Sequence, residues 1–261
     1  NYEVLLQIIT IFSIVFLLLS IPHLLNILSF GTSKWVSLLI LFPLFWNYVV
    51  INGMIDGAGL YYPYDIPSLT FFSIGVILFY KRKWLFFYPL FILALLNRES
   101  SCFISLAGFF LIIPNFNIGS FSWYKKNFTI ISHVLIQALL WLSSRVILSW
   151  YFRDNPGLFF EEPHSMFDFC MAIFKGQSHW AMYNPRWFLT IFAGFWIFPL
   201  LFFKKMNTLE CRFLMVGFIY IISLLFRSNM MEVRVYNELN IILFAVTVSF
   251  ISRVYRNPYT C

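Results

Sequence analysis

The sequence predicts an all-α fold, a polytopic transmembrane helical bundle with about nine hydrophobic segments. Of its 261 residues, 61% are hydrophobic and only 11% are charged, whereas about a quarter of the residues in a soluble domain are charged. Apolar stretches recur between short polar connections, and about 20 apolar residues cross a bilayer core. Basic residues gather in alternate connections, as in chains that cross a membrane repeatedly. We therefore expect one transmembrane helical domain over residues 1–261.

The candidate spans follow one another along the whole chain. They cover roughly 4–30, 35–52, 66–80, 84–97, 101–114, 127–150, 187–203, 212–226 and 238–252. The first differs from a secretion signal, because its apolar run is too long and no basic region precedes it. The sequence begins at Asn1 and opens almost directly in this apolar stretch. We therefore expect a fragment or a trimmed product.

Charge is divided unequally between the two sides of this topology. Eleven of the 18 Lys and Arg residues fall on one side, and ten of the 11 acidic residues fall on the other. The basic side is predicted to be cytoplasmic by the positive-inside rule. The opposite side holds the two longest loops, at about 53–65 and 151–186, and long loops in compact domains are usually functional. We expect the site to face away from the cytoplasm. The net charge of +7 would suggest a nucleic-acid partner in a soluble protein, but its division between the two sides of a membrane does not, and we expect no nucleic-acid partner.

A pair of short helices is expected around residues 84–114. Segments 84–97 and 101–114 have 14 residues each, about 21 Å of helix against a bilayer core of about 30 Å. One continuous helix is the alternative, but it would place Lys125 and Lys126 on the acidic side. The charge distribution favours a hairpin with its bend near the outer membrane boundary.

The motif Asn97-Arg98-Glu99-Ser100 lies at that bend. Charges at membrane depth are costly and tend to pair or to mark a pathway. Arg98 and Glu99 are adjacent and point to different sides of a helix, so we expect a separate partner for each. The alternative is an interfacial turn in which Arg98 extends to the lipid headgroups.

A second charged group precedes the last span and contains Arg227, Glu232, Arg234 and Glu238. Arg234 and Glu238 are four residues apart, which suits an ion pair on a helix. The guanidinium groups of Arg227 and Arg234 match phosphate oxygens in geometry. A solvated loop with one surface ion pair is the alternative.

Two acidic residues lie within the segment GMIDGAGLYYPYDIPS (53–68). Asp56 lies among glycines and tyrosines that could approach and stack on a sugar, and it is our preferred carboxylate. Asp65 is a second candidate, although Asp65-Ile66-Pro67-Ser68 equally reads as a helix start with Asp65 as the N-cap.

The loop 151–186 contains His164 and His179 near several acids. Their spacing matches no compact metal motif, so a solvated loop is the preferred interpretation and no metal ligand is assigned. Segment 165–174 is expected to form a short amphipathic helix that could cover a lipid-facing groove. Arg145, about two turns from the outer end of its span, either extends to the headgroups or joins a phosphate-binding set.

Three short segments carry a family resemblance: YDIPSLTFF (64–72), LLNRES (95–100) and MEVRVYNEL (231–239). With the topology above, they resemble the C-type glycosyltransferase superfamily of membrane proteins. The resemblance implies transfer of a sugar from a polyprenyl-phosphate donor on the non-cytoplasmic face. It implies catalytic carboxylates, for which the candidates are Asp56, Asp65 and Glu99. It also implies phosphate-binding cations, for which the candidates are Arg98, Arg227 and Arg234, with Glu232 and Glu238 in support. A divalent metal is a further cofactor of some such enzymes.

Two other functions stay open from sequence. The first is a transporter or flippase for a lipid-linked or anionic substrate, although the cytoplasmic half of each span is nearly uncharged, which counts against alternating access. The second is a non-catalytic subunit of a membrane complex, with protein subunits as partners. Membrane lipids are partners in every case, and a lipid-linked sugar donor is a partner in the first interpretation.

Overall fold

The computed structural model describes residues 2–29, 34–51, 64–113, 120–154, 166–176, 185–227 and 233–256. These residues form ten α-helices joined by short 3₁₀ and π-helical segments, and no β-strand occurs among them. Four helical stretches are long and apolar enough to cross a membrane: Val4–Leu28, Lys34–Ile51, Phe121–Tyr151 and Asn237–Arg256. The predicted all-α class is confirmed, and the four stretches suggest a multi-pass membrane protein.

Helix α1 (Tyr2–Leu28) packs along helix α4 (Asp65–Tyr80) through small polar side chains. The hydroxyl of Thr70 donates to the carbonyl of Ser13 at 2.7 Å, and the hydroxyls of Ser20 and Ser73 lie 2.6 Å apart. Small and hydroxylated residues let apolar helices approach closely, with hydrogen bonds between them.

The chain reverses direction between α5 (Trp84–Asn97) and α6 (Cys102–Ile112), as the sequence predicted. At the junction, Arg98 is extended, with φ −152° and ψ 146°. Both helices pack on α4, and α6 brings Ile104 against Gly75 and Gly108 against Phe79. These two contacts show that α4 and α6 run in the same direction, so α5 between them runs in the opposite direction. The alternative of one continuous helix over residues 84–114 is therefore wrong.

Two predicted spans are not regular helices. Residues 34–51 form a 3₁₀ segment η1 (Lys34–Ile40), helix α2 (Leu41–Phe45) and a π-helical segment η2 (Trp46–Ile51). The region predicted as a span at 187–203 contains the 3₁₀ segment η4 (Pro185–Gly194), helix α9 (Ile197–Phe202) and the start of η5 (Phe203–Lys205). Apolar composition predicted a membrane crossing in both places but carried no information on local helix type.

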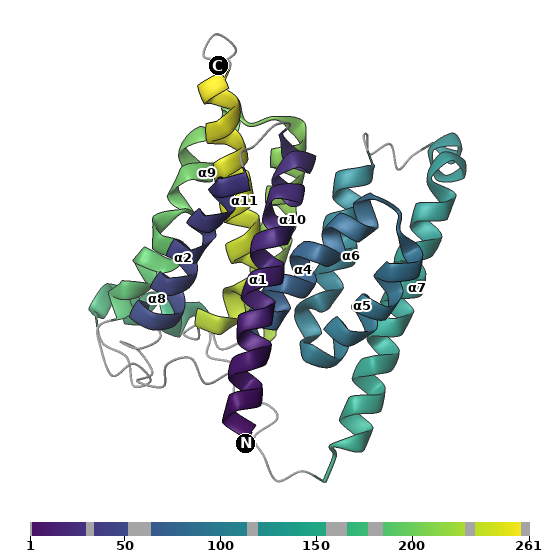
Figure 1. Cartoon of the computed structure of the whole chain (residues 1–261), viewed down its shortest axis with the longest axis horizontal. Coiled ribbons are helices and arrows are strands. Elements are labelled where there is room, and N and C mark those ends of the chain that lie inside the picture. Colours follow the sequence, from purple (N-terminus) through teal and green to yellow (C-terminus); the bar gives the residue numbers. More distant parts are fainter. Residues whose placement is uncertain are drawn as a thin grey trace.

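The C-terminal part of the chain is an antiparallel pair of helices, α10 (Thr208–Arg227) and α11 (Asn237–Arg256). The 3₁₀ segment η6 (Val233–Tyr236) leads directly into α11. Figure 1 shows α7 (Phe121–Tyr151) at one edge of the bundle and α2, α8 (Met166–Lys175) and α9 at the opposite edge. Between these edges lie α1, α10 and α11. The expected amphipathic helix at 165–174 is confirmed as α8.

The two ends of the bundle differ in charge. We call the end where α1 and α11 finish the basic end, and the end where α4 and α11 begin the acidic end. At the basic end Glu210 is fully buried. It accepts hydrogen bonds from the backbone of Asn207 (2.8 Å), from Ser249 (2.9 Å) and from Arg253 (3.0 Å). This group joins α10 to α11.

Candidate polar site at the acidic end

Five elements bring buried polar side chains together at the acidic end. They form what we call the polar cluster: Tyr48, Asp65, Arg98, Ser100, Tyr220, Asn237 and Glu238. Asp65 begins α4, and its side chain is 4% exposed. The extended backbone at Arg98 directs the guanidinium to this carboxylate, with Nη1 and Oδ1 at 3.0 Å.

Glu238 occupies the other side of the cluster and is 1% exposed. The Tyr220 hydroxyl donates to Oε2 at 2.6 Å, and the Ser100 hydroxyl donates to Oε1. Glu238 is therefore buried among hydrogen-bond donors, and the prediction of a solvated loop is wrong at this residue.

Asn237 links the carboxylate of Asp65 to a second tyrosine. Its amide nitrogen donates to the backbone oxygen and to Oδ1 of Asp65, at 3.2 and 3.3 Å. Its oxygen accepts a hydrogen bond from the Tyr48 hydroxyl. The Oδ1 atom of Asp65 is thus fixed by both Arg98 and Asn237.

The cluster keeps Arg98 charged. Burial lowers the pKa of the guanidinium, but the nearby carboxylates of Glu238 and Asp65 raise it by more, so the net pKa lies above its usual value. Two buried carboxylates already surround this one cation, which leaves it poorly placed to bind a third anion alone.

Glu99 points away from the polar cluster, as its position beside Arg98 predicted. Its side chain is 70% exposed and lies 3.9 Å from Nη1 of Arg145. Arg145 also donates to the carbonyl of Leu95 at 2.6 Å, and the Trp141 indole donates to the Glu99 carbonyl at 2.9 Å. Glu99 is therefore an accessible carboxylate beside α7, outside the cluster.

Asp65 does not cap α4. The helix begins at Asp65 itself, with Tyr64 in the N-cap position and no side-chain capping bond. The predicted cap is wrong because the carboxylate bonds to Arg98 and Asn237 across the bundle.

The remaining predicted site residues are placed only in part. Asp56 and Glu232 lie outside the described residues, as do His164 and His179. The backbone places Arg227 at the end of α10 and Arg234 in η6, both towards the acidic end, but their side chains are not described.

A divalent metal does not fit the described part of this site. Within the described ranges, no group of three or more His, Cys, Asp and Glu side chains could hold a metal ion. Oδ1 of Asp65 already accepts a hydrogen bond from Arg98, and the two carboxylate oxygens of Glu238 accept hydrogen bonds from Tyr220 and Ser100.

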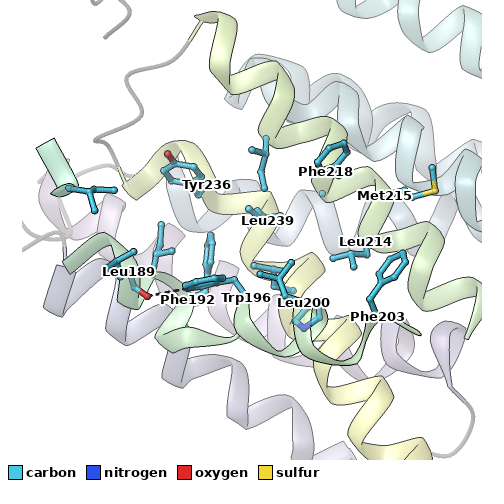
Figure 2. A pocket seen from close by; sticks show the side chains of 16 residues that line it. Leu189, Phe192, Trp196, Leu200, Phe203, Leu214, Met215, Phe218, Tyr236 and Leu239 are labelled. Carbon is cyan, nitrogen blue, oxygen red and sulfur yellow. Dashed lines mark hydrogen bonds between the residues drawn. The ribbon is translucent and has the colours of Figure 1, made fainter. Parts of the chain in front are cut away.

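An apolar groove of about 640 Å³ lies beside the cluster, within the size range of ligand pockets, about 300–1,000 Å³. One wall comes from η4, α9 and Ile173 of α8, and the other from α10 and the start of α11. Figure 2 shows Phe192, Trp196 and Leu200 on one side, and Leu214, Met215 and Phe218 on the other. Leu200 and Phe218 are 70% and 64% exposed, so the groove is open along its side.

The groove and the polar cluster share the wall made by α10 and α11. Tyr236 and Leu239 line the groove, and the two residues between them, Asn237 and Glu238, belong to the cluster. On α10, Ile221 lines the groove and the preceding Tyr220 donates to Glu238. An apolar chain in the groove would therefore lie one helix wall from the buried carboxylates.

Sequence reasoning missed Tyr48, Ser100, Tyr220 and Asn237 as site residues. Ser100 was noted only as part of its motif. A usable signal existed for Asn237, since an amide next to an acid at a span end is unusual in so apolar a chain. Tyr48 and Tyr220 are two of many aromatic residues in the chain, and nothing in the sequence around them distinguishes them as site residues.

Comparison with known proteins adds no relative: no family model, curated protein or solved structure matches the chain.

Proposed function

We propose that this chain is a polytopic membrane glycosyltransferase that transfers a sugar from a polyprenyl-phosphate donor on the non-cytoplasmic face. The observation that carries the proposal is the apolar groove, which is separated from the buried polar cluster by the single wall of α10 and α11. A polyprenyl-phosphate sugar joins a long hydrocarbon chain to an anionic, hydrophilic head. Its site must therefore combine an open apolar channel with fixed polar groups, and both are present here.

In this proposal nine hydrophobic segments cross or enter the bilayer, four of them long enough to cross it alone. The basic end faces the cytoplasm, because lysines and arginines remain on that side of a membrane. The acidic end then faces outward, with the polar cluster buried beneath its surface. The short pair α5 and α6 reaches the outer boundary at Arg98, whose charge lies among carboxylates and away from lipid.

Asp65 is the proposed general base among the described residues. It would take the proton of an acceptor hydroxyl as that oxygen attacks the anomeric carbon. The bond from this carbon to the phosphate oxygen breaks, and the polyprenyl phosphate leaves with the negative charge. Arg98 and Asn237 hold Oδ1 of Asp65 in place, and a base must be held within hydrogen-bond reach of the proton it removes.

Arg227 and Arg234 are the proposed phosphate ligands. Arg98 already has two carboxylates around it, so the leaving phosphate needs further cations. The backbone of both arginines lies where α10 ends and where the chain approaches α11. Glu99 is an accessible second candidate for the base, and Asp56 and Glu232 keep the catalytic and supporting roles predicted for them.

The distance along the bundle between the buried carboxylates of Glu238 and Glu210 favours a transferase over a transporter. Glu238 and Glu210 lie at opposite ends of the α10–α11 pair. The buried residues described between them include apolar Phe213, Val216 and Ile242 and neutral polar Asn240 and Thr247, but no charged side chain. A transport pathway for an anionic substrate along this pair would need charged groups between the ends.

Sugar transfer in proteoliposomes tests the proposal, with a polyprenyl-phosphate donor that carries a labelled sugar. Asp65→Asn is expected to lower the rate of transfer by roughly 10²–10⁴-fold, the usual contribution of a general base, with donor binding retained. Asp154→Asn is the matched control, because Asp154 forms an exposed pair with Arg153 at 3.3 Å. A full-length protein that neither binds a polyprenyl phosphate nor transfers its sugar would refute the proposal and favour an accessory subunit.

A further inference from the structure

One wall of the groove contains an unfavourable backbone. In η4, Phe192, Ala193 and Gly194 have φ angles of 58°, 52° and 78°. Glycine adopts this left-handed region freely, whereas the Cβ atoms of Phe192 and Ala193 make it unfavourable for them. Two such residues in succession persist only where the surrounding structure holds them.

The segment is held in place by two consecutive residues of η2. The Trp46 indole donates to the hydroxyl of Thr190 at 3.1 Å. The backbone N–H of Phe192 donates to Oδ1 of Asn47 at 2.7 Å. Asn47 and Phe192 are 3% and 2% exposed, and a buried hydrogen bond of this kind is costly to leave unmade.

The opposite wall is fixed at both ends. Tyr220 and Glu238 join α10 to α11 at the acidic end, and Glu210 with Ser249 joins them at the basic end. A change in the width of the groove must therefore come mainly from the η4 side.

We infer that Ile191–Gly194 is a gate in the groove wall: Trp46 and Asn47 hold it in the narrower of two positions, which we call closed, and its movement to a wider, open position admits a hydrocarbon chain from the bilayer through the side of the groove. The identity of that chain as a polyprenyl phosphate rests on the proposed function. The gate moves with α8, because Arg186 of η4 donates to the carbonyl of Phe174 at 3.0 Å and the neighbouring Ile173 lines the groove.

The same π-helical segment connects the gate to the polar cluster. Tyr48 follows Asn47 directly and donates to Asn237, which in turn holds Asp65. Opening of the gate displaces η2 and shifts the hydrogen bonds around the proposed base, so the cluster reaches its full geometry when the groove is closed.

Spin-label distances across the groove test the gate without any substrate. Labels on Leu189→Cys and Phe218→Cys report the separation of the two walls (Figure 2), and both positions are more than half exposed, at 52% and 64%. The four native cysteines are replaced by alanine, and pulsed electron paramagnetic resonance is recorded in nanodiscs. Two populations of distance are expected, with the closed one dominant.

Two further substitutions shift these populations in opposite directions. Asn47→Ala removes the clamp and raises the open-to-closed ratio by roughly tenfold, the factor for one lost buried hydrogen bond. Ala193→Gly relieves the left-handed strain and lowers the ratio by about fivefold. Asn127→Ala, which removes a bond to the Trp123 carbonyl within α7 at 2.9 Å, leaves the ratio unchanged.

The gate proposal is refuted if all variants give the same distance distribution. It is also refuted if Asn47→Ala and Ala193→Gly shift the open-to-closed ratio in the same direction. Added polyprenyl phosphate then separates the two proposals. If the variants shift as expected and the lipid does not bind, the gate stands and the proposed donor fails. If the lipid binds and no variant changes the distances, the donor stands and the gate is refuted.

Discussion

Replacement of Arg98 by methionine probes how the polar cluster is held together. Methionine is of similar length but removes the guanidinium that bonds Asp65 at 3.0 Å, where the side chains are 14% and 4% exposed. The substitution leaves the carboxylates of Asp65 and Glu238 buried without their shared cation. Removal of one partner of a buried ion pair costs about 3–5 kcal/mol, so Arg98→Met should lower the free energy of unfolding by that amount.

A double substitution separates the cost of the unpaired charge from the value of the pair. Arg98→Met with Asp65→Asn removes both charges, and we expect it to recover more than half of the loss, because an uncharged amide is left in place of an unpaired carboxylate. The control is Arg153→Met in the exposed pair with Asp154, expected to cost about 0–1 kcal/mol. Reversible unfolding in bicelles measures all three, and a loss in Arg98→Met no larger than in the control would refute the reasoning.

Two further substitutions test packing and the basic end. Gly108→Ala places a Cβ 2.3 Å from the ring of Phe79, so unfolding at a lower temperature is expected, with a loss of about 1–3 kcal/mol from overpacking; an unchanged melting temperature would contradict this close approach. Glu210→Ala leaves Arg253 without its carboxylate and should cost roughly 3–5 kcal/mol, with faster amide hydrogen exchange at the start of α10 as the measurement. Exchange equal to that of the native chain would show that Glu210 does not join α10 to α11.

Sequence patterns predicted the elements that depend on local composition. The hairpin at Arg98 and the separate partners of Arg98 and Glu99 followed from the placement of charges in an apolar chain, because the cost of a charge within lipid is visible in the sequence. The helix at 165–174 followed instead from its amphipathic pattern.

The composition of the polar cluster could not be predicted in the same way. Asn237 bonds to Tyr48 across 189 positions of the chain, and Ser100 bonds to Glu238 across 138 positions. Such pairs depend on which helices become neighbours, and uniformly apolar helices give little periodicity from which to derive their packing. The irregular backbone of η4 is likewise a tertiary effect, since Asn47 holds it from another element.

In the π-helical segment Trp46–Ile51, the directions of the side chains depend on the number of residues as well as on their identity. A π-turn contains one residue more than an α-turn, so removal of a single residue would restore α-helical register. Successive side chains of the segment would then be about 100° apart around the helix axis, instead of the closer angular spacing of a π-turn. Trp46 and Asn47 could no longer face Thr190 and Phe192 while Tyr48 faces Asn237. We therefore expect a change in residue number here to be at least as disruptive as substitution of Trp46, Asn47 or Tyr48.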